Sequence, residues 1–135
     1  MTLRHLALAI ALPCAFSLST SALAATCPVS GTLDGSFKAN DQGLYQLRQA
    51  GNTVWWIGKS ADGGASWTNV FRGTRKGSIV TGTWADITKD GGSGTLSLRV
   101  TANNQLQKID SGGSGFGGSI WLRPGCSFSK AVPID

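Results

Sequence analysis

The chain contains no glutamate, and its only histidine is His5, near the N-terminus. It has three cysteines and seven acidic residues in 135 residues, so thiols and carboxylates are also scarce. Serine and cysteine hydrolases need a histidine base, and zinc sites are built from histidine, cysteine and carboxylate ligands. The composition therefore argues against an enzyme, and it predicts no metal site and no cofactor. A pair of aspartates would still satisfy a glycosidase, which keeps an enzyme of unknown type as the third functional hypothesis.

Helical periodicity is also missing. No segment keeps apolar residues at a 3.6-residue spacing for three turns, so no helix is predicted. Beyond the N-terminal stretch, no apolar run approaches the about 20 residues that a membrane-spanning helix needs. We therefore expect no membrane partner.

The N-terminal stretch has the three parts of a secretory signal peptide. Arg4 and His5 form a basic start, residues 6–18 are nearly all apolar, and Ala22-Leu23-Ala24 fits the cleavage rule. The alternative is a membrane anchor, for which the apolar stretch is too short. We expect a signal peptide over residues 1–24, one domain over residues 25–135, and a secreted or periplasmic location.

Cleavage at that point would remove His5, Cys14 and Arg4, and would leave Cys27 and Cys126 at opposite ends of the domain. Two cysteines in a small secreted domain usually pair, although two free thiols are the alternative. A disulfide needs Cα atoms within about 7 Å of each other, so the first and last strands would be neighbours. That arrangement favours a closed barrel, and a sandwich with adjacent edges would also satisfy it.

Short runs of β-branched and aromatic residues alternate with glycine-rich turns along the chain, which is typical of all-β domains. We predict a single antiparallel up-and-down β-barrel of about eight strands, closed by the terminal disulfide. The longer loops, 60–66, 87–93 and 110–118, alternate with tight turns, so they are expected at one end, where binding usually sits. The expected strands are Val29–Phe37, Gly43–Gln49, Thr53–Lys59, Trp67–Gly73, Gly77–Asp86, Gly94–Thr101, Gln105–Ile109 and Ser119–Arg123.

Five tryptophans are the best lead to a function, since the chain has only one tyrosine. They could fill the core, line a pocket at the barrel mouth, or form an exposed platform for sugar rings. Trp55 and Trp56 are adjacent in a strand, so their rings must face opposite sides, and at least one should be available to a ligand. The candidate ligand-binding residues are Trp55, Trp56, Trp67, Asn69, Arg72, Trp84 and Trp121.

Charge is mildly basic and dispersed, at a formal +5, and only Arg72, Arg75 and Lys76 cluster. This pattern does not predict nucleic-acid binding, which uses interleaved basic and aromatic residues. Asp86, at a strand end, is the acid expected to be held by structure, with Arg48 or Arg123 as its partner. The alternative is an exposed aspartate.

The run from Tyr45 to Trp121 resembles a family of small secreted bacterial β-barrel domains of uncharacterised function. The matching motifs are Tyr45–Gln49, Val54–Gly58, Trp67–Gly73, Gly82–Asp86 and Gly113–Trp121. The chain departs from the pattern at Thr88, near which a proline is usual, and at Ser114-Gly115, which enlarges the last glycine loop. The resemblance implies a barrel similar in architecture to the calycin group, and it implies no ligand or reaction.

These observations predict a secreted, non-catalytic binding protein, expected to be monomeric. Its ligand would be a small molecule or a glycan, bound at the aromatic-lined barrel or the long-loop end. The alternative is a protein-interaction module, such as an inhibitor of a secreted hydrolase. An open interior would favour a small ligand, and a filled interior would favour surface recognition.

Overall fold

The structure, a computed structural model, describes residues 31–88, 90–101 and 105–126. Within these ranges it contains strands and no helix, and hence no helix that is long and apolar enough to cross a membrane. The predicted signal peptide and Cys27 lie outside the described residues. The strands are β1 (Gly35–Ala39), β2 (Leu44–Ala50), β3 (Thr53–Lys59), β4 (Thr68–Lys76), β5 (Ile79–Asp86), β6 (Ser93–Val100), β7 (Leu106–Ser111) and β8 (Ile120–Leu122).

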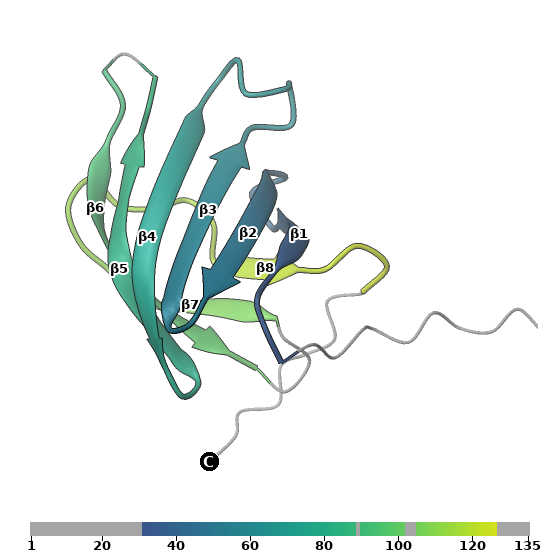
Figure 1. The fold of residues 1–135 in the computed structure, drawn as a ribbon. Coiled ribbons are helices and arrows are strands. Elements are labelled where there is room, and N and C mark those ends of the chain that lie inside the picture. Colours follow the sequence, from purple (N-terminus) through teal and green to yellow (C-terminus); the bar gives the residue numbers. More distant parts are fainter. Residues whose placement is uncertain (1–30, 89, 102–104, 127–135) are drawn as a thin grey trace, which may run out of the picture.

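Each strand pairs antiparallel with the next, and β8 pairs with β1, so the sheet closes into a barrel. Figure 1 shows β2 to β5 side by side, with β7 and β8 behind them. The closing contact is short: Lys38 lies opposite Leu122, and Ala39 lies opposite Trp121. The prediction of an all-β, up-and-down barrel of eight strands is confirmed. The terminal disulfide stays a prediction, because Cys27 is not described.

Two hairpins are set by glycines that adopt positive φ. Gly51 (φ 57°) and Gly77 (φ 59°) each occupy the first position of a two-residue turn, where glycine is favoured in type II′ hairpins. Because Lys76 pairs with Ile79, β4 is longer than expected and the turn starts at Gly77. The predicted end of this strand at Gly73 was therefore wrong.

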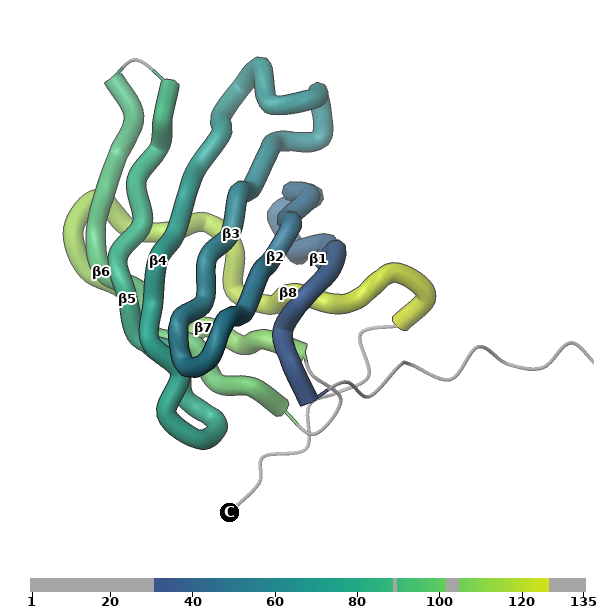
Figure 2. The backbone as a smooth tube through the Cα atoms, viewed as in Figure 1, coloured from purple at the N-terminus to yellow at the C-terminus, as the bar shows by residue number. Residues whose placement is uncertain are grey.

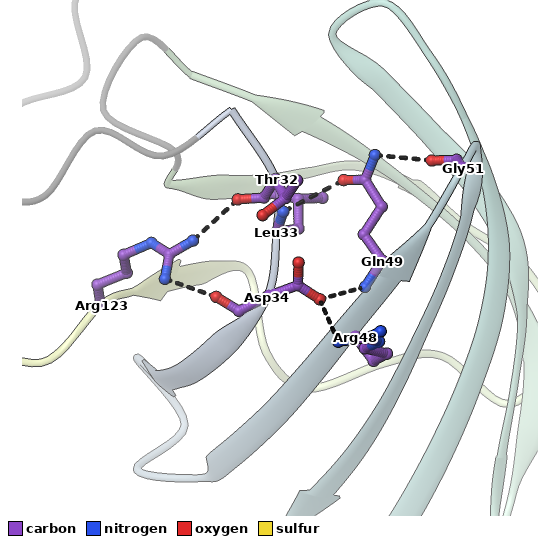
Figure 3. Close-up of polar contacts among 7 residues, drawn as sticks. All are labelled: Thr32, Leu33, Asp34, Arg48, Gln49, Gly51 and Arg123. Carbon is purple, nitrogen blue, oxygen red and sulfur yellow. Dashed lines mark hydrogen bonds and ion pairs between the residues drawn. The ribbon is translucent and has the colours of Figure 1, made fainter.

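The sequence predicted a first strand that begins at residue 29, but β1 begins at Gly35. The segment before it lies at the end of the barrel that carries the β2–β3 and β4–β5 turns, beside Gln49 and Arg123 (Figure 3). Its Leu33 side chain is fully buried, and its backbone N–H donates to Gln49 Oε1 at 3.2 Å. The guanidinium of Arg123 donates to the carbonyls of Asp34 at 2.7 Å and Thr32 at 3.0 Å. These bonds hold the chain entering β1 beside the chain leaving β8.

Aromatic rings fill the inside of the barrel. Trp56 stacks on Phe71 with a centroid distance of 4.4 Å, and its centroid lies 5.5 Å from that of Trp121. Tyr45 meets Trp56 edge to face at 5.4 Å. Rings in such offset and edge-on contacts bury large apolar areas and specify the packing. The core therefore consists of packed aromatic rings surrounded by aliphatic side chains, which come from β1, β2, β3, β5, β6, β7 and the segment before β1.

Two inward-facing glycines make this packing feasible. A Cβ on Gly58 would lie 2.4 Å from the Tyr45 ring, so the absence of a side chain gives the ring its place. A Cβ on Gly82 would lie 2.2 Å from the carbonyl oxygen of Arg72 on the adjacent strand. Because that second contact is with backbone, it could be relieved only by moving the sheet.

The longer loops share one end of the barrel, as expected, because successive strands run in opposite directions. Figure 2 shows the β3–β4 and β5–β6 connections at the top of the view, and the β7–β8 connection (yellow-green) passing beside β6. Within the described residues, Ser114 bonds Ser93 through both backbone and side chain, which ties the β7–β8 connection to the start of β6. Lys108 Nζ donates to the Phe116 carbonyl and fixes the same connection over the barrel. We call this the loop end, and the opposite one the turn end.

Candidate functional site

Trp55 and Trp56 face opposite sides of β3, as the alternation of strand side chains requires. Trp56 is 3% exposed, lies in the core and donates from Nε1 to Asn69 Oδ1 at 2.9 Å. Trp55 is 39% exposed on the outside of the barrel. Because large aromatic side chains are usually buried, an outward tryptophan is the unusual member of the pair.

An arginine flanks Trp55 on each neighbouring strand. Arg48 of β2 lies directly opposite it in one ladder, and Arg72 of β4 lies directly opposite it in the other. Directly opposite residues have Cβ atoms about 4.5–5.5 Å apart, close enough for both guanidinium groups to serve a ligand resting on the indole. Arg48 is 76% exposed, and its ion pair with Asp34 is loose at 3.9 Å. Exposed pairs of this kind are weak, so Arg48 is free to exchange its partner.

The surroundings of Trp55 are apolar and open. Ile57 and Val70, which pair with each other one row away, are 38% and 37% exposed. Among the described residues, the cation placed over an aromatic ring is Arg123 over Phe37, so no guanidinium caps the Trp55 indole. A flat apolar ligand surface could therefore stack on Trp55 without first displacing a cation.

Three open hollows lie in a row along this face, which we call the outer wall, meaning the outward-facing residues of β1–β5. The Lys38 hollow, of about 450 Å³, is lined by Lys38, Leu44, Gln46, Ile57, Lys59 and Pro124 among others. The Arg48 hollow, of about 460 Å³, includes Asp34, Gln46, Arg48, Trp55 and Ile57. The Arg72 hollow, of about 340 Å³, includes Trp55, Val70, Arg72, Thr83 and Ala85. Trp55 thus forms the boundary between the second and third hollows.

The remaining predicted site residues lie elsewhere. Trp84 and Trp121 are 6% and 0% exposed in the core, and Asn69 is buried beside Trp56. Trp67 is half-buried at the loop end, with its ring 5.9 Å from that of Tyr45. The structure therefore brings Trp55 and Arg72 together, and separates them from the other predicted residues by the thickness of the sheet.

The loop end is held by hydrogen bonds to carboxylates. Tyr45 Oη donates to Asp41 Oδ2 at 3.0 Å, and burial together with the Asp41 charge raises the pKa of the phenol well above its usual range. Asp62 accepts hydrogen bonds from the hydroxyls of Ser60 and Ser66, which lower the pKa of its carboxyl. These contacts organise loops, and each carboxylate accepts hydrogen bonds from its own loop or from the strand that follows it.

Asp86 has a different partner from the predicted one. Its carboxylate accepts the backbone N–H of Gly92 at 3.2 Å and closes the loop between β5 and β6. The two candidate arginines both go to the segment before β1, since Arg48 pairs with Asp34 and Arg123 donates to backbone carbonyls (Figure 3). The expected Asp86–arginine pair was wrong because Asp86 lies at the loop end of β5, three strands away from Arg48 on β2, and Arg123 is held by the segment before β1.

Asp34 is the acid that these arginines approach. It accepts the backbone N–H of Gln49 at 2.8 Å, and this bond is the main cause of a lowered pKa, assisted by Thr32, Arg48 and Arg123. Sequence reasoning did not single out Asp34, because the register that brings β2 beside the incoming chain is a long-range feature.

Arg48 is the site residue that sequence reasoning missed. The hairpin turn at Gly51-Asn52 pairs Ala50 with Thr53, and the same register places Arg48 opposite Trp55. Pairing the residues of the two strands outward from that turn would have placed Arg48 opposite Trp55. The position of Arg72 depends on the longer connection between β3 and β4, which carries no comparable signal.

The acids of the domain are unevenly distributed. Asp41, Asp62, Asp86, Asp90 and Asp110 belong to the loop end or to the strand residues next to it, whereas the outward-facing strand residues of β1–β5 include no acid. Asp34 lines the Arg48 hollow, but the four cations that line the three hollows, Lys38, Lys59, Arg48 and Arg72, outnumber it. An anionic ligand would therefore meet repulsion at the loop end and net attraction along the hollows of the outer wall.

No protein-family model, curated protein or solved structure matches this chain. The resemblance to small secreted β-barrel domains accordingly stays a prediction.

Proposed function

We propose that this protein is a secreted, non-catalytic glycan-binding protein that uses the outer wall of its barrel. The observation that carries the proposal is the position of Trp55, exposed on that wall between Arg48 and Arg72 while Trp56 fills the core. This moves the expected site from the barrel mouth and the loop end to the side of the barrel.

The chemistry of the three side chains suits a sugar. One face of a pyranose ring presents C–H groups, which pack against the electron-rich face of an indole. Its hydroxyl or carboxylate groups lie around the rim of the ring, where planar guanidinium groups donate paired hydrogen bonds. The shallow, open hollows around Trp55 suit a ligand that is approached from the side.

The proposal includes the disulfide between Cys27 and Cys126. It is supported by the way Arg123 ties the chain after β8 to Thr32 and Asp34, since Cys27 is five residues before Thr32 and Cys126 three after Arg123. Such a bridge implies an oxidising compartment, in keeping with the predicted signal peptide.

The proposal that the protein is non-catalytic rests on its composition and on carboxylates that already accept hydrogen bonds. After loss of the signal peptide the chain would contain neither histidine nor glutamate. Of the described aspartates, Asp34, Asp41, Asp62 and Asp86 each hold a backbone N–H or a neighbouring hydroxyl. Carboxylates held in this way serve structure rather than proton transfer.

A second candidate, the protein-interaction module, is favoured by one observation. Leu44, Ile57 and Val70 are all more than a third exposed on the same wall, and adjoining apolar side chains with a polar rim also mark protein interfaces. The two candidates use the same surface, so the test must distinguish the ligand rather than the place.

The test is calorimetric titration of the mature protein with four probes: oligogalacturonate, heparin oligosaccharide, cellohexaose and dextran. We expect saturable binding to at least one, weakened about tenfold or more by Trp55→Ala. Ile109→Ala is the control, because Ile109 is also exposed (44%) but lies on β7, away from the outer wall. No binding to any probe, or binding that Trp55→Ala leaves unchanged, would overturn the proposal.

A further inference from the structure

The outer wall is basic along its whole width. The cations that line its hollows are Lys38 on β1, Arg48 on β2, Lys59 on β3 and Arg72 on β4, whereas Lys76 at the end of β4 lies outside them. The outward-facing strand residues of β1–β5 include no carboxylate to neutralise them. One described acid does line the hollows: Asp34 borders the Arg48 hollow, where it pairs loosely with Arg48.

The three hollows are continuous with one another. The Lys38 and Arg48 hollows share Gln46 and Ile57, and the Arg48 and Arg72 hollows share Trp55. Together they run from β1 to β5, which is four strand spacings, or about 19 Å. A single sugar ring on Trp55 would leave the Lys38 hollow empty, so the row fits a chain of sugars.

Each hollow combines a cation with an apolar floor. Lys38 and Lys59 flank Leu44, which is 57% exposed and pairs with Lys59 across the ladder. Arg48 and Arg72 flank Trp55 in the same manner. The repeat of cation, apolar surface and cation across the wall matches a polymer in which ring faces alternate with negative groups.

From this arrangement we propose that the ligand is a linear anionic polysaccharide that crosses the strands, with one sugar on Trp55 and its next charged units at Lys38 and Lys59. The inference rests on the proposed function and goes beyond it by naming the ligand class and its path. Charge complementarity selects the anionic class, and the width of the row of hollows selects a polymer over a monosaccharide.

A single-stranded nucleic acid is the competing polyanion. Proteins that bind it stack successive bases on several aromatic rings. The outer wall offers one exposed ring, Trp55, and the other hollows are floored by aliphatic side chains such as Leu44 and Val70. The observations therefore favour a sugar polymer.

The experiment measures affinity for oligogalacturonates of two, four, six and eight units, with oligodeoxythymidylate as the second polyanion. Two variants are compared with the native sequence: Lys38→Gln/Lys59→Gln, which neutralises the Lys38 hollow, and Lys76→Gln/Arg99→Gln. The second is the matched control, because it removes the same charge from positions outside the three hollows.

We expect affinity to rise with length up to the oligomer that spans the row, and to fall as salt is added. Lys38→Gln/Lys59→Gln should weaken the affinity for the octamer about tenfold or more and leave the affinity for the dimer within about twofold. Lys76→Gln/Arg99→Gln should change the affinities for the octamer and the dimer by the same small factor. If Trp55→Ala abolishes binding but neither length nor the lysine pair matters, the extended path is wrong and the proposed function stands. Tighter binding of oligodeoxythymidylate than of the octamer would overturn the choice of polymer, and loss of all Trp55 dependence would overturn the proposed function itself.

Discussion

Trp55 and Trp56 are consecutive residues whose side chains lie on opposite sides of one strand, the first 39% exposed on the outer wall and the second 3% exposed against Phe71. This relationship separates the surface ring of Trp55 from a packed interior set, while Trp67 is half-buried at the loop end. It also means that stability and binding can be changed separately by neighbouring substitutions.

Trp56→Ala should destabilise the domain by about 3–5 kcal/mol, because it empties the centre of the aromatic core and leaves the buried oxygen of Asn69 without its donor. Trp55→Ala should cost less than about 1 kcal/mol, since the ring is partly solvated already. Urea denaturation of both variants measures the difference. Equal losses from the two substitutions would contradict the division into a surface ring and a core ring.

Tyr45 should stay protonated in the folded protein above pH 10. Its folded pKa is raised by burial and by Asp41, above the unfolded value of about 10, so this stability is complete below pH 10 and is lost as pH rises beyond it. Tyr45 is the only tyrosine, so ultraviolet titration of the phenolate reports it alone. We expect ionisation to coincide with unfolding, and a normal titration near pH 10 in guanidinium. Free ionisation of the native protein near pH 10 would disprove the buried hydrogen bond to Asp41.

Gly82→Ala should destabilise by about 2 kcal/mol or more, because the new Cβ would meet the carbonyl of Arg72 and the Cα of Gly73 on β4. Thr81→Ala on the same strand is the control, since Thr81 is exposed. Thermal unfolding of both proteins compares them. If Gly82→Ala lowered the unfolding temperature no more than Thr81→Ala does, the two strands would be able to separate more easily than the structure indicates.

Cys27 and Cys126 should form one intramolecular disulfide, and its loss should cost about 2–5 kcal/mol in the chain-entropy account. Non-reducing peptide mapping should find a single cross-linked peptide. Alkylation of both thiols in the native mature protein would show that the disulfide does not form. The barrel would then be closed, among the described contacts, by the β1–β8 pairing and by Arg123.

The fold was predictable because strand signals are local. Alternation in residues 94–100 and the glycine turn at Gly51 define strands and hairpins without tertiary information. Closure of the barrel was predictable only indirectly, through the cysteine spacing. The start of β1 was missed because residues 32–34 bond to Gln49 and Arg123, partners distant in the sequence.

The site was only partly predictable from the sequence, because side-chain alternation is a local signal whereas strand register is not. Alternation alone placed Trp55 and Trp56 on opposite faces, but it could not say which ring was outside. Arg72 was proposed from the sequence, whereas its position opposite Trp55 depends on the β3–β4 register. The row of three hollows is a property of five strands together, which no single segment encodes.

The most direct test of the central claim is the indole N–H spectrum of the ¹⁵N-labelled protein, with the Trp55 signal assigned from Trp55→Phe. The spectrum is followed during titration with the oligosaccharide of the panel that binds most tightly. The account predicts that the Trp55 signal shifts along a saturable curve, while the signals of buried Trp84 and Trp121 stay in place. A shift of the buried indoles with an unmoved Trp55 would place the ligand inside the barrel and contradict the account.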